Sequence, residues 1–262
     1  MINLKITDKD NNILKETSGD NLCVVYDKAY NEGDKITITS DSEFLSLKLS
    51  ETLAESIVYV PGKVFEFKIP SGEKLVAYAP GTWDGTKNVI TAAETPEEEI
   101  YKTRNIALNS TALRHEERYF PYAKANHVTR DEAWFEERNS IDGVVHTNGH
   151  GAYPFGSYAG GAREDIEYYL YFGKTAEIYE ITFFLRADFA DDHDTYWKSF
   201  DIEFDNGEKI SAKFEKSGEG QTITLSKPAK TSSIHLTNFK QAAFPLSWAA
   251  LSQIEVKGRY IK

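Results

Sequence analysis

Apolar and polar residues alternate along most of this chain, and helical periodicity is nearly absent. Alternation with a period of two is typical of strands that bury one face. In the first third of the chain the pattern predicts seven short strands, near residues 4–7 and at 22–26, 35–39, 44–50, 56–60, 63–69 and 74–79. Short strands at this spacing are typical of a small β-sandwich.

Alternation resumes after residue 165 and predicts a second sandwich. Its strands are expected at 166–173, 177–186, 200–204, 209–214, 222–225, 233–238 and 251–258. The clearest local signal is Asn206-Gly207, which tolerates the positive φ of a two-residue type I′ hairpin turn. Acids at 201 and 203 would then face lysines at 209 and 213 across the hairpin.

Two segments between these regions show no such alternation. Residues 91–100 contain Pro96 and three consecutive glutamates, which indicates a linker or a short helix capped by Thr95. Residues 105–165 are irregular, and a loop region of that length is usually functional. We therefore expect an all-β protein with two sandwich domains, 1–95 and 96–262, with Tyr78 and Trp83 packed at their boundary.

Charge narrows the range of partners. The 30 basic and 41 acidic residues give a net charge of −11, which argues against nucleic acid and anionic membranes as binding partners.

Cys23 is the only cysteine, so neither an internal disulfide nor a thiolate metal cluster can form. The N-terminus has no signal pattern and no apolar run reaches about 20 residues. As written, a soluble cytoplasmic protein is expected; a secreted protein already trimmed of its signal would look the same.

Metal and catalytic motifs are weak. Residues 188–194 hold four aspartates and His193, while His146 and His150 are four apart in a glycine-containing loop, where that spacing means little. The sequence has no His-Glu-x-x-His helix, no calcium-loop pattern and no Gly-x-Ser-x-Gly elbow. The aspartates are expected in an exposed loop, whereas a general acid needs an apolar pocket that raises its pKa.

Sugar recognition fits the loops better. Aromatic faces stack on pyranose rings while Arg, Asp, Asn and His bind the hydroxyls, and the loops at 112–135, 144–163 and 186–198 hold both kinds of residue. The candidate ligand residues are Arg114, His115, Trp134, His146, His150, Tyr153, Arg186, Asp188, His193 and Trp197. A purely structural role is the alternative for these residues. On that interpretation Trp197 closes the end of the core, Tyr153 fills the end of the sandwich, and Arg186 forms an ion pair with Asp188.

The second half of the chain resembles a known family. Ser140-Ile141-Asp142-Gly143, Tyr171-Phe172-Gly173, Asn206-Gly207 and the strand containing Gln253 stand, in order, where the galactose-binding-like superfamily has its short motifs. This is the discoidin, or coagulation-factor type C, jelly-roll sandwich that carbohydrate-binding modules also use. The resemblance covers residues 104–262 and implies sugar binding by end loops. It also implies a structural calcium ion at Asp142, although Gln253 stands where the family has a glutamate ligand.

These observations predict a non-catalytic carbohydrate-binding protein that requires no cofactor, with the C-terminal sandwich as the binder. Two alternatives remain open. One is a metal-dependent, glycan-active enzyme centred on Asp188, His193 and His146. The other is a protein-interaction module.

Overall fold

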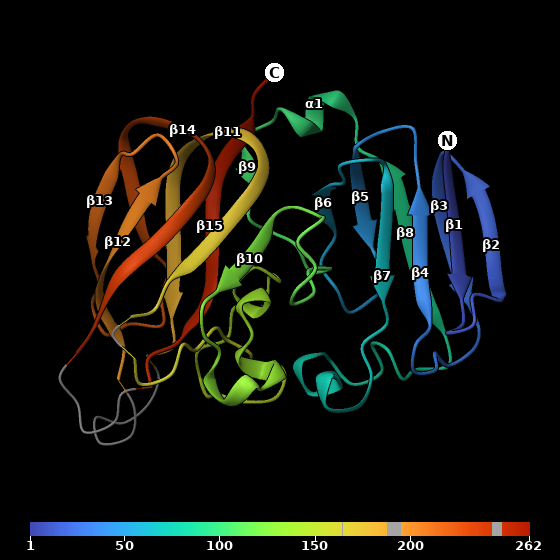
Figure 1. Ribbon diagram of the computed structural model, residues 1–262, viewed down its shortest axis with the longest axis horizontal. Coiled ribbons are helices and arrows are strands. Elements are labelled where there is room, and N and C mark those ends of the chain that lie inside the picture. Colours follow the sequence, from blue (N-terminus) through green and yellow to red (C-terminus); the bar gives the residue numbers. More distant parts are fainter. Residues whose placement is uncertain (164, 188–194, 243–247) are drawn as a thin grey trace.

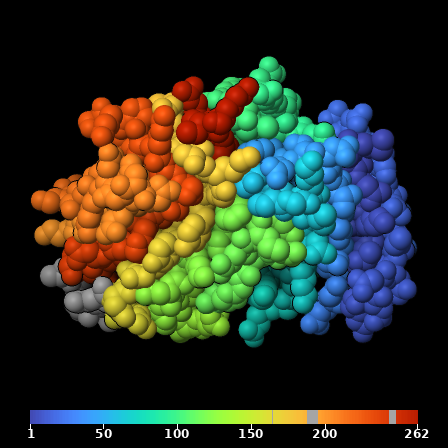
Figure 2. Space-filling view, turned by 45° about the horizontal axis from the view of Figure 1, so that its top comes forward, coloured from blue at the N-terminus to red at the C-terminus, as the bar shows by residue number. Residues whose placement is uncertain are grey.

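The computed structural model describes residues 1–163, 165–187, 195–242 and 248–262. The architecture is all-β, as predicted, with two β-sandwiches side by side (Figure 1). The irregular segment 105–165 lies between them and touches both, which the surface view also shows in green (Figure 2). Since this segment carries most of the candidate ligand residues, its packing decides where they lie.

The N-terminal sandwich consists of two four-stranded antiparallel sheets. One has the order β2-β1-β4-β7 and the other β3-β8-β5-β6. The strands are β1 (Ile2–Thr7), β2 (Ile13–Gly19), β3 (Asn21–Tyr26), β4 (Lys35–Thr39), β5 (Phe44–Lys48), β6 (Ser56–Tyr59), β7 (Val64–Lys68) and β8 (Asn88–Glu94). Alternate residues of β1, β3 and β4 are buried, so the period-two pattern marks the core faces correctly.

Two predictions for this region are wrong. Residues 74–79 form no strand: the chain makes a 3-10 helix, η1 (Gly72–Ala77), whose turn buries Ala77 and then Tyr78. The segment 91–100 is not a linker throughout, because β8 occupies its first part and pairs with both β3 and β5. A short helix, α1 (Glu97–Ile100), follows, with Pro96 rather than Thr95 at its N-cap.

The C-terminal sandwich is formed by one strongly bent antiparallel sheet of seven strands, including β10. Its strands are β9 (Arg104–Asn105), β10 (Tyr122–Ala125), β11 (Tyr168–Leu185), β12 (Trp197–Phe204), β13 (Lys209–Lys213), β14 (Gln221–Gln241) and β15 (Leu251–Tyr260). The sequence suggested two strands each where β11 and β14 run continuously. The pairing of β11 with β14 shifts register between Tyr171 and Ala176, around Gly173. Each of these long strands therefore takes part in both layers of the sandwich, around a common core.

The β12–β13 hairpin is present, but its turn type differs from the prediction. Only Gly207 of the pair has a positive φ, 82°. The N–H of Phe204 donates to Glu208 and that of Gly207 donates to Phe204, both at 2.9 Å, which describes a type I turn followed by a left-handed glycine. Lys209 pairs with Asp201 and Glu203 across the strands, at 3.0 and 2.9 Å.

Contacts between the sandwiches are extensive. Tyr59 of β6 and Phe120 exchange both backbone hydrogen bonds, at 2.8 and 3.0 Å. The ring of Tyr119 packs on Phe65, and its hydroxyl accepts from the backbone N–H of Glu66 at 2.9 Å. Residues 2–92 supply most of one buried hydrophobic cluster and residues 100–260 most of the other. The domain boundary near residue 96 stays a prediction, and the division of the buried residues into these two clusters favours it.

Candidate functional site

The candidate site lies where the sandwiches face each other. From the N-terminal side come the end of β7 and helix η1; from the other come residues 113–116 and the short helices η2 (Thr129–Asp131), η3 (Ala133–Phe135) and η4 (Glu137–Ser140). The N–H of Tyr153 donates to the carbonyl of Val76 at 2.7 Å and ties the loop 144–155 to η1. We call this junction the seam.

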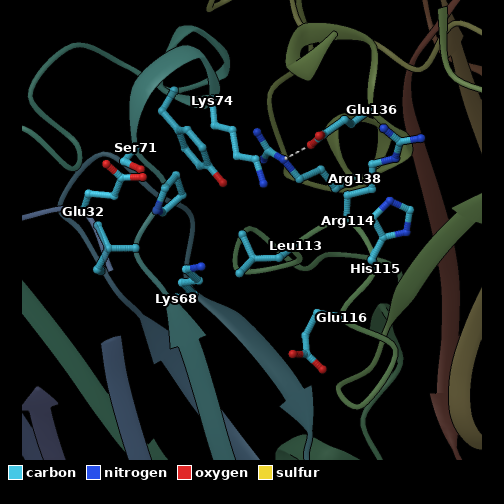
Figure 3. Close-up of a pocket in the computed structure, with 13 residues that line it drawn as sticks. Glu32, Lys68, Ser71, Lys74, Leu113, Arg114, His115, Glu116, Glu136 and Arg138 are labelled. Atoms are coloured by element: carbon cyan, nitrogen blue, oxygen red, sulfur yellow. Dashed lines mark hydrogen bonds and ion pairs between the residues drawn. The ribbon is translucent and has the colours of Figure 1, made fainter. Parts of the chain in front are cut away.

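A cavity of about 430 Å³ opens at the seam, and we call it the cleft. Figure 3 shows Lys68 and Lys74 on one side of it and Arg114 and His115 on the other. Its lining residues are Glu32, Lys68, Ile69, Pro70, Ser71, Lys74, Tyr78, Leu113, Arg114, His115, Glu116, Glu136 and Arg138. The lining therefore combines four permanent cations, one histidine and three carboxylates.

A buried pair of side chains forms one wall of the cleft. The guanidinium of Arg138 lies 4.3 Å from the centre of the Tyr78 ring and 3.1 Å from a carboxylate oxygen of Glu136. Trp83 contacts the edge of the same tyrosine ring at a centroid distance of 5.6 Å. Tyr78 and Trp83 both belong to the N-terminal buried cluster, and both line a hollow that Tyr153 shares from the other side.

Arg114 is held by acids on the side away from the cleft. It pairs with Asp131, and its Nε lies 3.8 Å from the carboxylate of Glu137. Burial raises the pKa of Glu137 to about 7. His115 is exposed at the cleft mouth, with a positive φ of 67° that turns the chain there.

Two smaller hollows adjoin the wall. One, about 210 Å³, is lined by Tyr78, Arg138, Asp142 and Tyr153 among others; the second, about 300 Å³, includes Trp83 and again Tyr153. Tyr78 lines all three cavities. Tyr153 keeps 38% of its surface exposed, so its ring is available to a ligand.

The candidate ligand residues thus fall into separate groups. Arg114, His115 and Tyr153 line the seam cavities. His146 and His150 are exposed on the adjoining loop, while Trp134 is half-buried and donates its indole N–H to Glu132 at 2.8 Å. Asp188 and His193 lie outside the described residues.

Trp197 and Arg186 need correcting as ligand residues. The Trp197 indole is fully buried against Tyr158 and Phe239, because its position at the start of β12 points it into the core. Arg186 is also buried, at 2% exposure, and donates to the carbonyl of Trp248 at 2.8 Å. Neither offers a surface to a sugar; Trp197 instead fills the structural role that the sequence left open.

The calcium ion implied by the resemblance stays a prediction, and both side chains that it would use accept hydrogen bonds from the backbone. Oε1 of Gln253 accepts from the N–H of Gly143 at 3.3 Å, and a carboxylate oxygen of Asp142 accepts from Val144 at 2.8 Å. Burial raises the pKa of Asp142 to about 7, and the nearby cation is Arg138. Calcium needs six to eight oxygen ligands. Within the described ranges, no three His, Cys, Asp or Glu side chains gather into a metal-binding group.

The sequence missed the cleft residues of the N-terminal sandwich, Lys68 and Lys74, and also Arg138. Two lysines beside a strand look like ordinary surface residues, so no sequence signal marks them.

No helix in the described part of the chain is long and apolar enough to cross a membrane.

No protein-family model matches this sequence, and comparison with curated proteins gives no match either. Similar solved structures include a chitosan-binding module from the chitosanase/glucanase of Paenibacillus sp. IK-5, with 16% identity and a TM-score of 0.40. That match covers 59% of this chain and 99% of the module. A family 32 carbohydrate-binding module from C. perfringens NanJ, in complex with galactose, has 17% identity and a TM-score of 0.36, over 51% of this chain and 90% of that one.

A fucose-binding module of Streptococcus pneumoniae is 13% identical with a TM-score of 0.40, over 59% of this chain and 95% of that one. Similarity of this degree does not carry a ligand over to the present chain.

Proposed function

We propose that this protein binds a carbohydrate without transforming it, and that the seam holds the ligand. The observation that carries the proposal is that Arg114 and His115 from one loop and Tyr153 from another line cavities meeting at Tyr78. A cleft of about 430 Å³ falls within the range of about 300–1,000 Å³ typical of small-ligand sites. An arginine and a histidine suit sugar hydroxyls, and an exposed tyrosine ring suits the apolar face of a pyranose.

Two of the three carboxylates that line the cleft are engaged by arginines, which favours binding over hydrolysis at this place. Glycoside hydrolysis needs one carboxylic acid to give a proton and a second carboxylate opposite it. Glu116 accepts two hydrogen bonds from Arg118, at 2.6 and 2.7 Å, and Glu136 accepts one from the buried Arg138. Both carboxylates are thereby already engaged by arginine side chains, so neither is free to give a proton to a bound glycan.

The test is a glycan array followed by calorimetry on the full chain. We expect Arg114→Gln and Tyr153→Ala to weaken retention of the bound glycan by about tenfold or more, while the glycan stays chemically intact. Arg163→Gln and Tyr179→Ala are the matched controls, because both residues lie away from the seam cavities.

A loss with Arg163→Gln but not Arg114→Gln would move the site to another part of the C-terminal loops and contradict the proposal. Release of reducing sugar that a chelator stops would favour the metal-dependent enzyme instead. Failure to retain any glycan, with capture of a protein partner, would favour the interaction module.

A further inference from the structure

We infer that the saccharide held at the seam carries a negative charge, as a uronate or a sulfate ester, and that both sandwiches supply cations to bind it. This inference rests on the proposed function and names its ligand class. Lys68 ends β7 and Lys74 lies in η1, so both come from the N-terminal sandwich. Arg114 comes from the other side of the cleft, where Arg138 is already paired with Glu136 (Figure 3).

The charge balance of the cleft favours an anion. Two of its three carboxylates are already neutralised: Glu116 by Arg118 and Glu136 by Arg138. Among the residues that the structure describes, neither Lys68 nor Lys74 forms an ion pair with a carboxylate, and Glu32 lies on their own side of the cleft (Figure 3). Two cations without an ion-pair partner make this place attractive to anions, against a net charge of −11 for the whole protein.

The absence of an open aromatic face points the same way. Apart from His115, Tyr78 is the only ring among the described residues that line the cleft. It is 6% exposed, with Arg138 over its face and Trp83 at its edge. Stacking on a pyranose, which supplies much of the affinity for neutral sugars, is therefore not available inside the cleft. Charge-assisted hydrogen bonds are the interactions that remain.

The lysines and the arginine of the cleft would bind an acidic sugar in different ways. The ammonium groups of Lys68 and Lys74 act as mobile point charges, which accept either a carboxylate or a sulfate. Arg114 lines the opposite wall, and its pairing with Asp131 uses part of its planar set of donors. An acidic pyranose bridging the two walls would contact both domains, so the isolated C-terminal loops would make only part of the site.

The experiment measures calorimetric affinity of the full chain for trigalacturonate, its neutral methyl ester and a sulfated galactose oligomer. We expect one or both acidic probes to bind about tenfold tighter than the ester in about 20 mM NaCl, with most of the difference lost in about 500 mM NaCl. The double variant Lys68→Gln/Lys74→Gln should remove the preference. The control Lys15→Gln/Lys213→Gln changes the net charge equally at the outer edge strands β2 and β13 and should preserve it.

Each outcome decides one point. Equal binding of acid and ester, undisturbed by the Lys68 and Lys74 changes but lost with Arg114→Gln, overturns this inference and leaves the proposed function standing. Equal losses in the test and control double variants also overturn it, because net charge alone would explain them. Preference for only the sulfated or only the carboxylated probe supports it and identifies the acidic group. No binding of any glycan overturns both proposals.

Discussion

The guanidinium of Arg138 stacks on the ring of Tyr78 at 4.3 Å, and the two residues belong to different sandwiches. Arg138 is 4% exposed and Glu136, its carboxylate partner, is 7% exposed. A buried ion pair of this kind costs much to break, because removing one member leaves the other charged in a poorly hydrated place. The contact therefore holds the seam in one geometry while also shaping the cleft wall.

Removing the charge of Arg138 should destabilise the protein strongly. Arg138→Met keeps the aliphatic stem but leaves Glu136 uncompensated, so we expect a loss of about 3 kcal/mol or more in the free energy of unfolding, measured with urea. Arg130→Met, which breaks an exposed pair with Glu132, should cost less than about 1 kcal/mol. Adding Glu136→Gln to Arg138→Met should recover part of the loss; no recovery would mean that the stacking, not the charge, matters.

Glu137 should make stability fall as pH rises. Burial raises its pKa to about 7, above the value of an unfolded chain, so the folded state holds the proton more tightly. Its contribution is complete below about pH 4 and is lost as pH passes through about 7. Glu137→Gln should therefore equal the wild type near pH 4 and exceed it by about 3 kcal/mol near pH 8. Glu117→Gln, at an exposed position, should show no such divergence, and parallel curves for all three proteins would contradict the assignment.

Trp197 should matter for folding and not for sugar binding. Trp197→Ala removes a fully buried indole and should cost about 3–5 kcal/mol, whereas Trp197→Phe should fold with a smaller loss. Thermal denaturation measures the first effect. If folded Trp197→Phe lost glycan retention as Tyr153→Ala is expected to, the indole would be contacting the ligand after all.

Gly173 should tolerate no side chain. An added Cβ would lie 2.5 Å from the ring of Phe120 and 2.7 Å from that of Tyr59, at a φ of 75°. Gly62 has a similar φ of 81° with nothing within 4 Å, so Gly62→Ala isolates the backbone cost, on the order of 1 kcal/mol. We expect Gly173→Ala to lose at least about 1 kcal/mol more in urea unfolding. Equal losses would show that the rings move aside.

The sequence predicted most strands because alternation records which face of a strand is buried, and burial is a local consequence of residue type. It erred where that signal is ambiguous. Leu75, Val76 and Ala77 suit a strand or a 3-10 helix equally, and β8 ends in small and acidic residues that resemble a linker. The sequence predicts two strands in place of each of β11 and β14, because Gly173 in β11 and the mostly polar run 226–232 in β14 interrupt the alternation.

By itself, then, the sequence determined an all-β chain with two sandwiches and an irregular segment rich in hydrogen-bonding and aromatic residues. Only the tertiary structure decided that Trp197 and Arg186 are buried, and that Lys68, Lys74, Arg114 and Arg138 share one cleft. The physical reason is that period-two patterning specifies an inside and an outside for each strand but not which distant segment lies opposite. That choice depends on packing at the seam, where Tyr78 meets Arg138 across sixty residues of chain.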